Sequence, residues 1–504
     1  MKSNFNGTSN PKDVTYQINS IRIKYLLFAI LILSGFTHLW NAVGFPDLFF
    51  DEGVYMRRAM HVLAGLGPQE AFFHDHPFFG QIFLASMLYV IGFPASLHPS
   101  TSPDSISTLY LVPRIIMGLL AVADTFLIYK IAENRYGTKV ALISSMLFAV
   151  MPMTWMVRRI LLDSILLPFL LASILLAMKS KTCNRKSAIV LLSGICMGLA
   201  VFTKIPVFAM IPLVAGLVYF GNQKNAKMVV LWIIPVILIP FIWPLQSIES
   251  GQFNLWVDDV LSQTQRHSSG LPYISKLFFE MDPVLFVLGM AGMAFCIYRK
   301  DYVILMWFVP FVIFLLAIGF NQYFYWIPVL PVFCISASVL IVRVLGMIKK
   351  EKTNKVTPYA IIVGLGVFGL ASTVLLITTN MSSSEFQAAS FVLQHVKDRD
   401  NQTTILASPT YSWLFDSVFH KQNVFIDYSL ALWQPIPTKK VVLVVDQHYL
   451  IDINRGSKLK QLYNDSKTIA TFDGNVKNYD TSLYPYTNLR VNYEGHRIEI
   501  KETS

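Results

Sequence analysis

Repeated apolar runs constrain this chain more than any other feature of its sequence. A helix of about 20 residues, rising 1.5 Å per residue, crosses the apolar core of a bilayer. Hydrophobic residues make up 54% of the chain and charged residues only 14%, so the runs predict a polytopic α-helical membrane protein. They lie near residues 23–43, 78–97, 109–132, 139–157, 160–178, 188–203, 205–221, 228–245, 283–298, 302–320, 326–348 and 358–378.

The charges of the connecting loops indicate which runs cross. Lys and Arg concentrate in cytoplasmic loops, and the basic loops fall on one side only if 78–97 does not span. The segment GFPASLHP (92–99) weakens a long helix there. We therefore predict about 11 transmembrane helices, with 78–97 lying along or dipping into the outer interface. The basic loops are 133–139, 179–187, 221–227, 298–302 and 349–355.

This topology accounts for the net charge of +11 without nucleic-acid binding. It makes residues 1–22 a cytoplasmic tail and 23–380 the transmembrane domain, with external loops at 44–108 and 246–282. The chain is then an integral multi-pass protein of the cell membrane. The four cysteines suggest neither a disulfide framework nor a metal cluster.

The composition changes after the last apolar run, and residues 381–504 resemble ordinary soluble sequence. Alternating strand and helix patterns predict a small α/β domain, which the topology places outside the cell. The expected helices are 382–400 and 449–465, and the expected strands are 403–409 and 439–446.

The predicted topology gathers unusual polar residues on the external face. Asp51 and Glu52 are adjacent carboxylates at the start of a helical pattern, where they would favour the positive end of the helix dipole. Lys204 lies at the outer end of a span, against the bias that keeps basic residues inside. Cations beside an acidic pair suit an anionic headgroup and a general base. The other residues gathered there include HDH (74–76), Arg114, RRILLD (158–163) and NQYFYW (321–326).

Each of these residues also has a structural interpretation. Arg158 and Arg159 begin a predicted span, and Asp163 one turn later suits an intrahelical ion pair. Lys204 can extend its amine to the interface. His74 and His76 could hold a metal ion, although such residues are more often merely interfacial.

The order of these motifs resembles that of the protein O-mannosyltransferase family and of the related lipid A aminoarabinose transferases, which have the GT-C fold. The matching pieces run through about residue 330, and two departures accompany them: HPFFG lacks the family's second proline, and the β-trefoil of the eukaryotic members is missing. The pieces are FDEGVY (50–55), HP (76–77), VPRIIMGLLAV (112–122), RRILLDSILLPF (158–169), GLAVFTK (198–204) and YFYWIPVLP (323–331).

The resemblance implies an inverting glycosyltransferase. It would move mannose or a similar hexose from a polyprenyl (dolichyl) phosphate donor to a hydroxyl of a protein or lipid-linked acceptor, on the outer face of the membrane. Asp51 matches the proposed base and Glu52 its neighbour. Arg114, Arg158 and Lys204 match basic positions near the donor phosphate, and Tyr325 is a looser match there. Residues expected in an acceptor or metal region are His74, His76, Asp163 and His267, with Asp163 interpreted as structural.

No cofactor is required by the sequence, although the external carboxylates and histidines permit a divalent ion. A transporter or a non-enzymatic scaffold is the alternative, favoured only by the proline-rich run 233–244 and opposed by the absence of visible repeats. An oligosaccharyltransferase would need a WWD-type motif, which SWLFD (412–416) is not.

Overall fold

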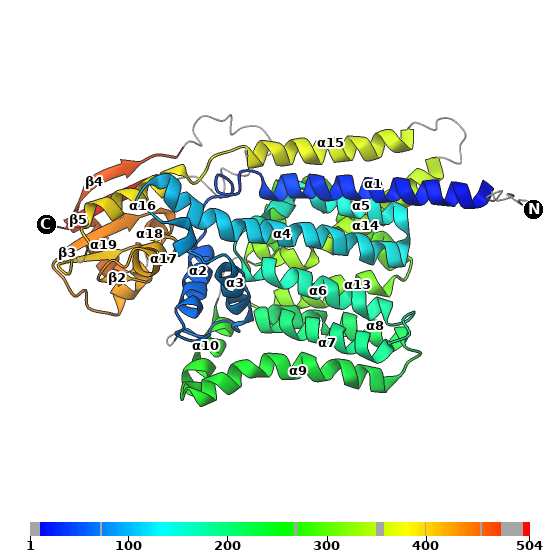
Figure 1. Ribbon diagram of the computed structural model, residues 1–504, viewed down its shortest axis with the longest axis horizontal. Coiled ribbons are helices and arrows are strands. Elements are labelled where there is room, and N and C mark those ends of the chain that lie inside the picture. Colours follow the sequence, from blue (N-terminus) through cyan, green and yellow to red (C-terminus); the bar gives the residue numbers. More distant parts are fainter. Residues whose placement is uncertain are drawn as a thin grey trace, which may run out of the picture.

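The protein is a bundle of membrane-crossing helices with a small α/β domain at one end (Figure 1). The computed structural model describes residues 11–70, 73–266, 270–348, 357–398, 400–453, 456–474 and 497–503. The first helix, α1 (Pro11–Leu39), begins at the end of the bundle that is farthest from the α/β domain (Figure 1). The start of α1 and the α/β domain therefore lie at opposite ends of the bundle.

Seven helices in the described residues are long and apolar enough to cross a bilayer, or nine if each of two bent pairs forms one span. The seven are Ile21–Leu39 of α1, α4 (Pro103–Tyr136), α6 (Leu162–Lys179), α7 (Lys186–Thr203), α9 (Ala226–Glu249), Tyr323–Met347 and α15 (Thr357–Ile377). The segment Tyr323–Met347 joins η4 (Tyr323–Val329) to α14 (Leu330–Ile348). The bent pairs are α5 (Thr138–Val150) with η2 (Pro152–Arg158), at 70°, and α11 (Leu271–Met281) with α12 (Pro283–Tyr298), at 119°.

Three shorter apolar helices affect the predicted count of eleven spans. Of these, α3 (Phe79–Val90) has 12 residues, or about 18 Å at 1.5 Å per residue, which is too short to cross. This length agrees with the expectation that 78–97 stays at the interface. Eleven spans would require both η3 (Ile205–Met210) with α8 (Ile211–Gly221) and α13 (Tyr302–Ala317) to cross, which stays a prediction.

The C-terminal domain is built on a five-stranded mixed sheet with the strand order β2-β1-β3-β5-β4. Strand β1 is parallel to both β2 and β3, whereas β5 is antiparallel to β3 and β4. The register places Ile405 opposite Val442 and Val444 opposite Ile500. The strands are β1 (Thr403–Leu406), β2 (Val424–Phe425), β3 (Lys440–Val445), β4 (Ser466–Phe472) and β5 (Ile498–Thr503).

The helices of this domain agree with the prediction of an α/β fold but differ in one detail. The single helix expected over 449–465 is wrong, since α18 (Gln447–Asp452) ends before α19 (Ser457–Asp465) begins. Gly456 precedes α19 in an extended conformation, which interrupts the helical path. The other elements are α16 (Ser383–His395), α17 (Pro409–Trp413), η6 (Leu414–Val418) and η7 (Tyr428–Leu432).

The α/β domain packs tightly against α2 (Phe50–Leu63) and the adjoining end of α4. Gly53 of α2 lies so close to the Pro409 carbonyl that an added Cβ would overlap it. The Tyr110 hydroxyl of α4 donates to the Thr410 carbonyl oxygen at 2.6 Å and accepts from Trp413 Nε1 at 2.9 Å. Buried apolar side chains of both parts form one shared core, which holds the domain in place over α2.

Candidate active site

Asp51 and Glu52 occupy the first turn of α2 but point in different directions. Successive residues of a helix are rotated by about 100°, so adjacent side chains do not share a surface. Glu52 is fully buried, whereas Asp51 keeps partial exposure. The two carboxylates therefore have different surroundings and different chemical capacities.

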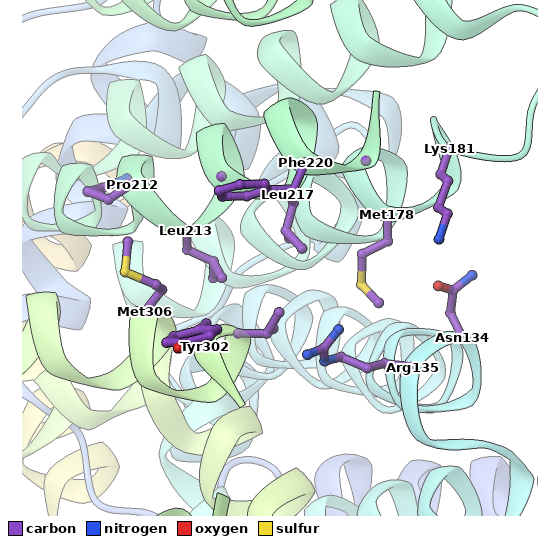
Figure 2. A pocket seen from close by; sticks show the side chains of 13 residues that line it. Asn134, Arg135, Met178, Lys181, Pro212, Leu213, Leu217, Phe220, Tyr302 and Met306 are labelled. Carbon is purple, nitrogen blue, oxygen red and sulfur yellow. The ribbon is translucent and has the colours of Figure 1, made fainter. Parts of the chain in front are cut away.

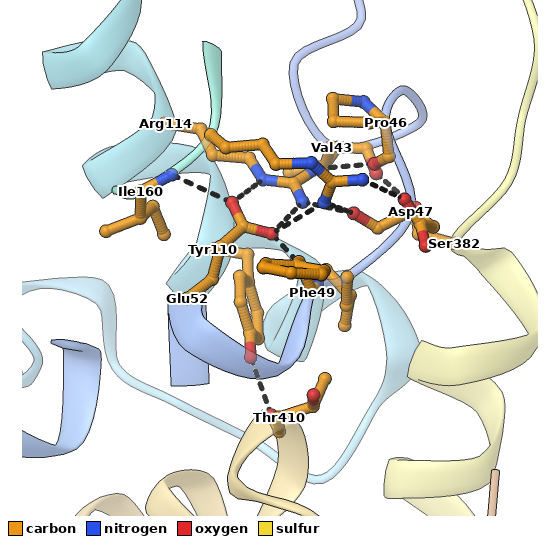
Figure 3. Close-up of polar contacts among 12 residues, drawn as sticks. Val43, Pro46, Asp47, Phe49, Glu52, Tyr110, Arg114, Ile160, Ser382 and Thr410 are labelled. Atoms are coloured by element: carbon orange, nitrogen blue, oxygen red, sulfur yellow. Dashed lines mark hydrogen bonds and ion pairs between the residues drawn. The ribbon is translucent and has the colours of Figure 1, made fainter. Parts of the chain in front are cut away.

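Glu52 receives hydrogen bonds and ion pairs from four other residues (Figure 3). Arg114 donates to both carboxylate oxygens, from Nη2 at 2.6 Å and from Nε at 3.0 Å. The backbone N–H groups of Ile160 and Phe49 donate at 2.9 and 3.0 Å, and Arg159 Nη1 lies at 3.3 Å. Although burial raises the pKa of Glu52, the charges of Arg114 and Arg159 outweigh this effect and hold it below its usual range.

Every N–H donor of the Arg114 guanidinium binds either Glu52 or the loop before α2. Besides its bonds to Glu52, its guanidinium donates to the carbonyl oxygens of Ala42, Pro46 and Asp47 at 2.7 to 2.9 Å. A guanidinium has five N–H donors, and these contacts use all of them. The geometry therefore does not support the expectation that Arg114 binds the donor phosphate; it makes Arg114 the counterion of Glu52.

The prediction that Arg158 and Arg159 begin a span and pair with Asp163 is wrong. Arg158 ends η2, and α6 begins only at Leu162. Arg158 donates to the Trp40 carbonyl oxygen and lies over the Phe45 ring. Arg159 binds Asp47 and Glu52.

Asp163 instead forms a buried ion pair with Lys204, with 2.6 Å between Nζ and Oδ2. Lys204 directly follows α7, and its ammonium lies over the rings of Phe324 and Tyr325, at 4.8 and 4.5 Å from the ring centroids. The structure thus brings together three predicted site residues from distant parts of the chain: Asp163, Lys204 and Tyr325. The pairing agrees with the structural role expected of Asp163, because it fixes the position of the ammonium group.

The Asp51 carboxylate lies within electrostatic range of Lys204 and accepts no hydrogen bond from the residues that the structure describes. Burial raises its pKa to about 6, and the nearby carboxylates of Asp75 and Asp163 contribute in the same direction. Lys204 and His448 act in the opposite direction. A carboxylate with free lone pairs and a pKa near neutrality can accept a proton from a bound hydroxyl group.

The HDH segment lies nearby, but its side chains have separate partners. Asp75 pairs with Arg58 at 2.5 Å, and His74 contacts Gln252 at 3.2 Å. Burial lowers the pKa of His76 to about 3, so its imidazole is neutral at pH 7. Across the described ranges, no group of three or more His, Cys, Asp or Glu side chains is arranged to hold a metal ion. A divalent ion stays a prediction, and His267 lies outside the described residues.

Sequence reasoning missed four residues of this region: Arg58, Phe49, Trp155 and His448. Arg58, from α2, pairs with Asp75. The rings of Phe49 and Trp155 lie against the guanidinium of Arg159. His448 comes from the α/β domain, and no sequence signal connects it with residue 51.

A pocket of about 740 Å³ lies apart from this cluster, among the ends of α4, α6, α8 and α13 (Figure 2). Its walls are mostly apolar, with Arg135 and Lys181 at one side. None of the predicted site residues lines it.

We expect Glu52→Ala to lower the free energy of unfolding much more than Glu133→Ala does. The first change leaves the buried charge of Arg114 without its counterion, which costs about 3–5 kcal/mol. Glu133 pairs with Lys130 where both side chains are about one-third exposed, so its loss costs roughly 0–1 kcal/mol. Thermal unfolding of both purified variants in detergent measures the difference, and equal melting temperatures would contradict the structural role of Glu52.

The family model of dolichyl-phosphate-mannose-protein mannosyltransferases matches residues 28–246, which is less than half of the chain. No curated protein sequence matches. The chain therefore shares a family signature over its first spans, including Asp51, Glu52, Arg114, Asp163 and Lys204.

Solved structures match over nearly the whole chain. ArnT from Cupriavidus metallidurans, bound to undecaprenyl phosphate, has a TM-score of 0.59 and 14% identity, over 95% of this chain and 97% of that one. The archaeal oligosaccharyltransferase AglB from Archaeoglobus fulgidus, in complex with an inhibitory peptide and a dolichol-phosphate, has a TM-score of 0.54 and 12% identity, over 90% of this chain and 73% of that one. These matches show that the chain has the GT-C fold of membrane glycosyltransferases.

Proposed function

We propose that this protein transfers a sugar from a polyprenyl-phosphate donor to a hydroxyl group, with inversion at the anomeric carbon and with Asp51 as the general base. The observation that carries the proposal is the environment of Asp51, a carboxylate with a pKa of about 6 and no hydrogen bond from the described chain. It lies beside the fixed cation Lys204, so a proton acceptor and a stabiliser of negative charge occur together.

The comparisons and the chemistry of the site support this donor class. The ArnT structure holds undecaprenyl phosphate and the AglB structure holds a dolichol-phosphate, and the matching family model is named for dolichyl-phosphate-mannose. A lipid phosphate that leaves during transfer gains negative charge, which a preorganised cation in a dry site stabilises. Lys204 suits this task, since its ammonium has three donors and the Asp163 pair uses one.

The reaction needs one base and one displacement. Asp51 takes the proton of the acceptor hydroxyl while the oxygen forms its bond to the anomeric carbon. The bond from that carbon to the phosphate oxygen breaks on the opposite face, so the configuration inverts. The phosphate leaves without needing a proton, and the proton stays on Asp51 until solvent removes it.

The other predicted residues support this centre. Glu52, Arg114 and Arg159 hold the start of α2 in place, as described above. Tyr325 gives Lys204 an aromatic surface and lies at the donor side of Asp51. Arg158, whose contacts are with Trp40 and Phe45, has no assigned step.

We propose mannose or a similar hexose as the sugar, and a protein or a lipid-linked glycan as the acceptor. Mass spectrometry of glycans on membrane proteins and lipids, from cells with and without the gene, identifies both. The GT-C fold favours this enzyme over the transporter or scaffold, because the candidate residues gather at one end of the bundle and not at its midplane.

We expect Asp51→Asn to abolish transfer while the protein still folds. Removal of a general base lowers kcat by about 100-fold or more. The lost carboxylate makes no hydrogen bond with the described part of the chain, so its loss should not destabilise α2. The assay follows release of polyprenyl phosphate by reconstituted protein given polyprenyl-phosphate-mannose and a membrane fraction as acceptor. The matched control is Asp258→Asn, an exposed carboxylate of α10 (Phe253–Gln265). Wild-type turnover by Asp51→Asn would remove the base assignment.

The pH dependence of the wild-type protein gives a second test. A base must be deprotonated to act, so kcat/KM should rise with pH and level off above about 6, the pKa of Asp51. Below this value the rate should fall about tenfold per pH unit. A profile that is flat between pH 4.5 and 8 would contradict the assignment.

Lys204→Gln should weaken use of the donor. The change removes the cation proposed to stabilise the phosphate, and we expect the donor kcat/KM to fall by about 100-fold, as for loss of one oxyanion donor. Lys276→Gln is the control, since Lys276 of α11 is exposed. Equal donor kinetics for the two variants would place the phosphate elsewhere.

A further inference from the structure

His448 is a side chain of the α/β domain that lies near the candidate base. It lies in α18, and its ring centroid is 5.4 Å from that of Phe50 and 6.2 Å from that of Phe49. These phenylalanines immediately precede Asp51, and the charge of a protonated His448 acts on the Asp51 carboxylate. The His448 ring is half-buried and makes no hydrogen bond with the described residues. Its ring nitrogens are thus available to a ligand.

The position of His448 is fixed by contacts on both sides. Asp446 caps α18 by accepting from the Tyr449 N–H at 2.8 Å, and it also accepts from the Ser408 hydroxyl at 2.6 Å. Ser408 directly precedes α17, whose first residue, Pro409, contacts Gly53 of α2. A short chain of contacts therefore connects His448 to the helix that carries Asp51, so the two side chains keep their relative position.

Asp51 has neighbours of two different origins. Lys204 and Tyr325, which act electrostatically on or with Asp51, lie at the ends of membrane helices, which is the side that a lipid-linked donor reaches from the bilayer. His448 comes from the domain beyond the bundle (Figure 1). An inverting displacement requires the attacking hydroxyl on the face opposite the leaving phosphate. The side of Asp51 away from Lys204 is therefore where the acceptor hydroxyl belongs.

We propose that His448 positions the acceptor hydroxyl for deprotonation by Asp51. This inference rests on the function proposed above. A neutral imidazole carries one N–H donor and one nitrogen acceptor, so it can bind a hydroxyl oxygen or a neighbouring polar group of the acceptor without competing for the donor phosphate. His448 is thus a positioning residue that the α/β domain supplies to the membrane site.

The test compares His448→Phe with His448→Gln. Phenylalanine keeps the ring against Phe49 and Phe50 but cannot form hydrogen bonds, whereas glutamine keeps a donor and an acceptor. With polyprenyl-phosphate-mannose held saturating, a membrane fraction from cells lacking the gene is added at rising amounts. His448→Phe should raise the apparent acceptor KM about five- to tenfold, as expected for one lost hydrogen bond, and His448→Gln should restore most of the loss.

Two further readouts separate positioning from folding. Binding of polyprenyl phosphate and slow transfer of the sugar to water should be the same in His448→Phe as in the wild type, because neither uses the acceptor. The control is His395→Phe, a change in the same domain at a residue that pairs with Glu502 and not with the site. An unchanged acceptor KM, a loss of donor binding, or full activity of the Phe variant would overturn the inference. A wild-type protein without turnover would instead overturn the proposed function itself.

Discussion

The buried ion pair between Glu52 and Arg114 is the interaction on which the rest of the site depends. It joins the start of α2 to α4 through two hydrogen bonds between charged groups. Charge-assisted bonds of this kind are both strong and directional. Arg114 also gathers three carbonyl groups of the loop before α2. A buried charge left unpaired would be very costly, so the cluster has one favourable arrangement, and that arrangement fixes the orientation of Asp51.

The adjacent carboxylates Asp51 and Glu52 therefore have different surroundings and different pKa values. Glu52 is surrounded by donors, which hold its pKa low and keep its lone pairs occupied. Among the residues that the structure describes, Asp51 has no such donor, and burial raises its pKa to about 6. The first property suits a residue that organises structure, and the second suits a residue that accepts a proton. The difference arises from helix geometry, because neighbouring positions on α2 face different parts of the protein.

The α/β domain contributes to the same centre from the other side. Its close contact at Gly53 and its hydrogen bonds to Tyr110 make it part of the wall around α2. A lipid-linked donor and an acceptor that does not share the bilayer core must meet at one carbon atom. In the reaction proposed above, a membrane bundle with a domain packed over one end would give each of them a separate approach, and Asp51 would lie where the two approaches meet.

The sequence by itself determined the membrane class, the α/β domain and the candidate base. Hydrophobic run length, loop charge and strand–helix alternation are local properties, and each depends on physics that acts within a short segment. The carboxylates at 51 and 52 were also visible, as was the unusual cation at 204.

What the sequence did not contain was the pairing of these charges. Arg114 was expected at the donor phosphate and instead forms an ion pair with Glu52. Asp163 was expected beside Arg158 or Arg159 and instead forms an ion pair with Lys204. His448 could not be connected with Asp51 at all. Only the tertiary structure decided these partners, because the partner of a buried charge depends on which distant segments share the same low-dielectric space, and neither spacing nor composition encodes that distance.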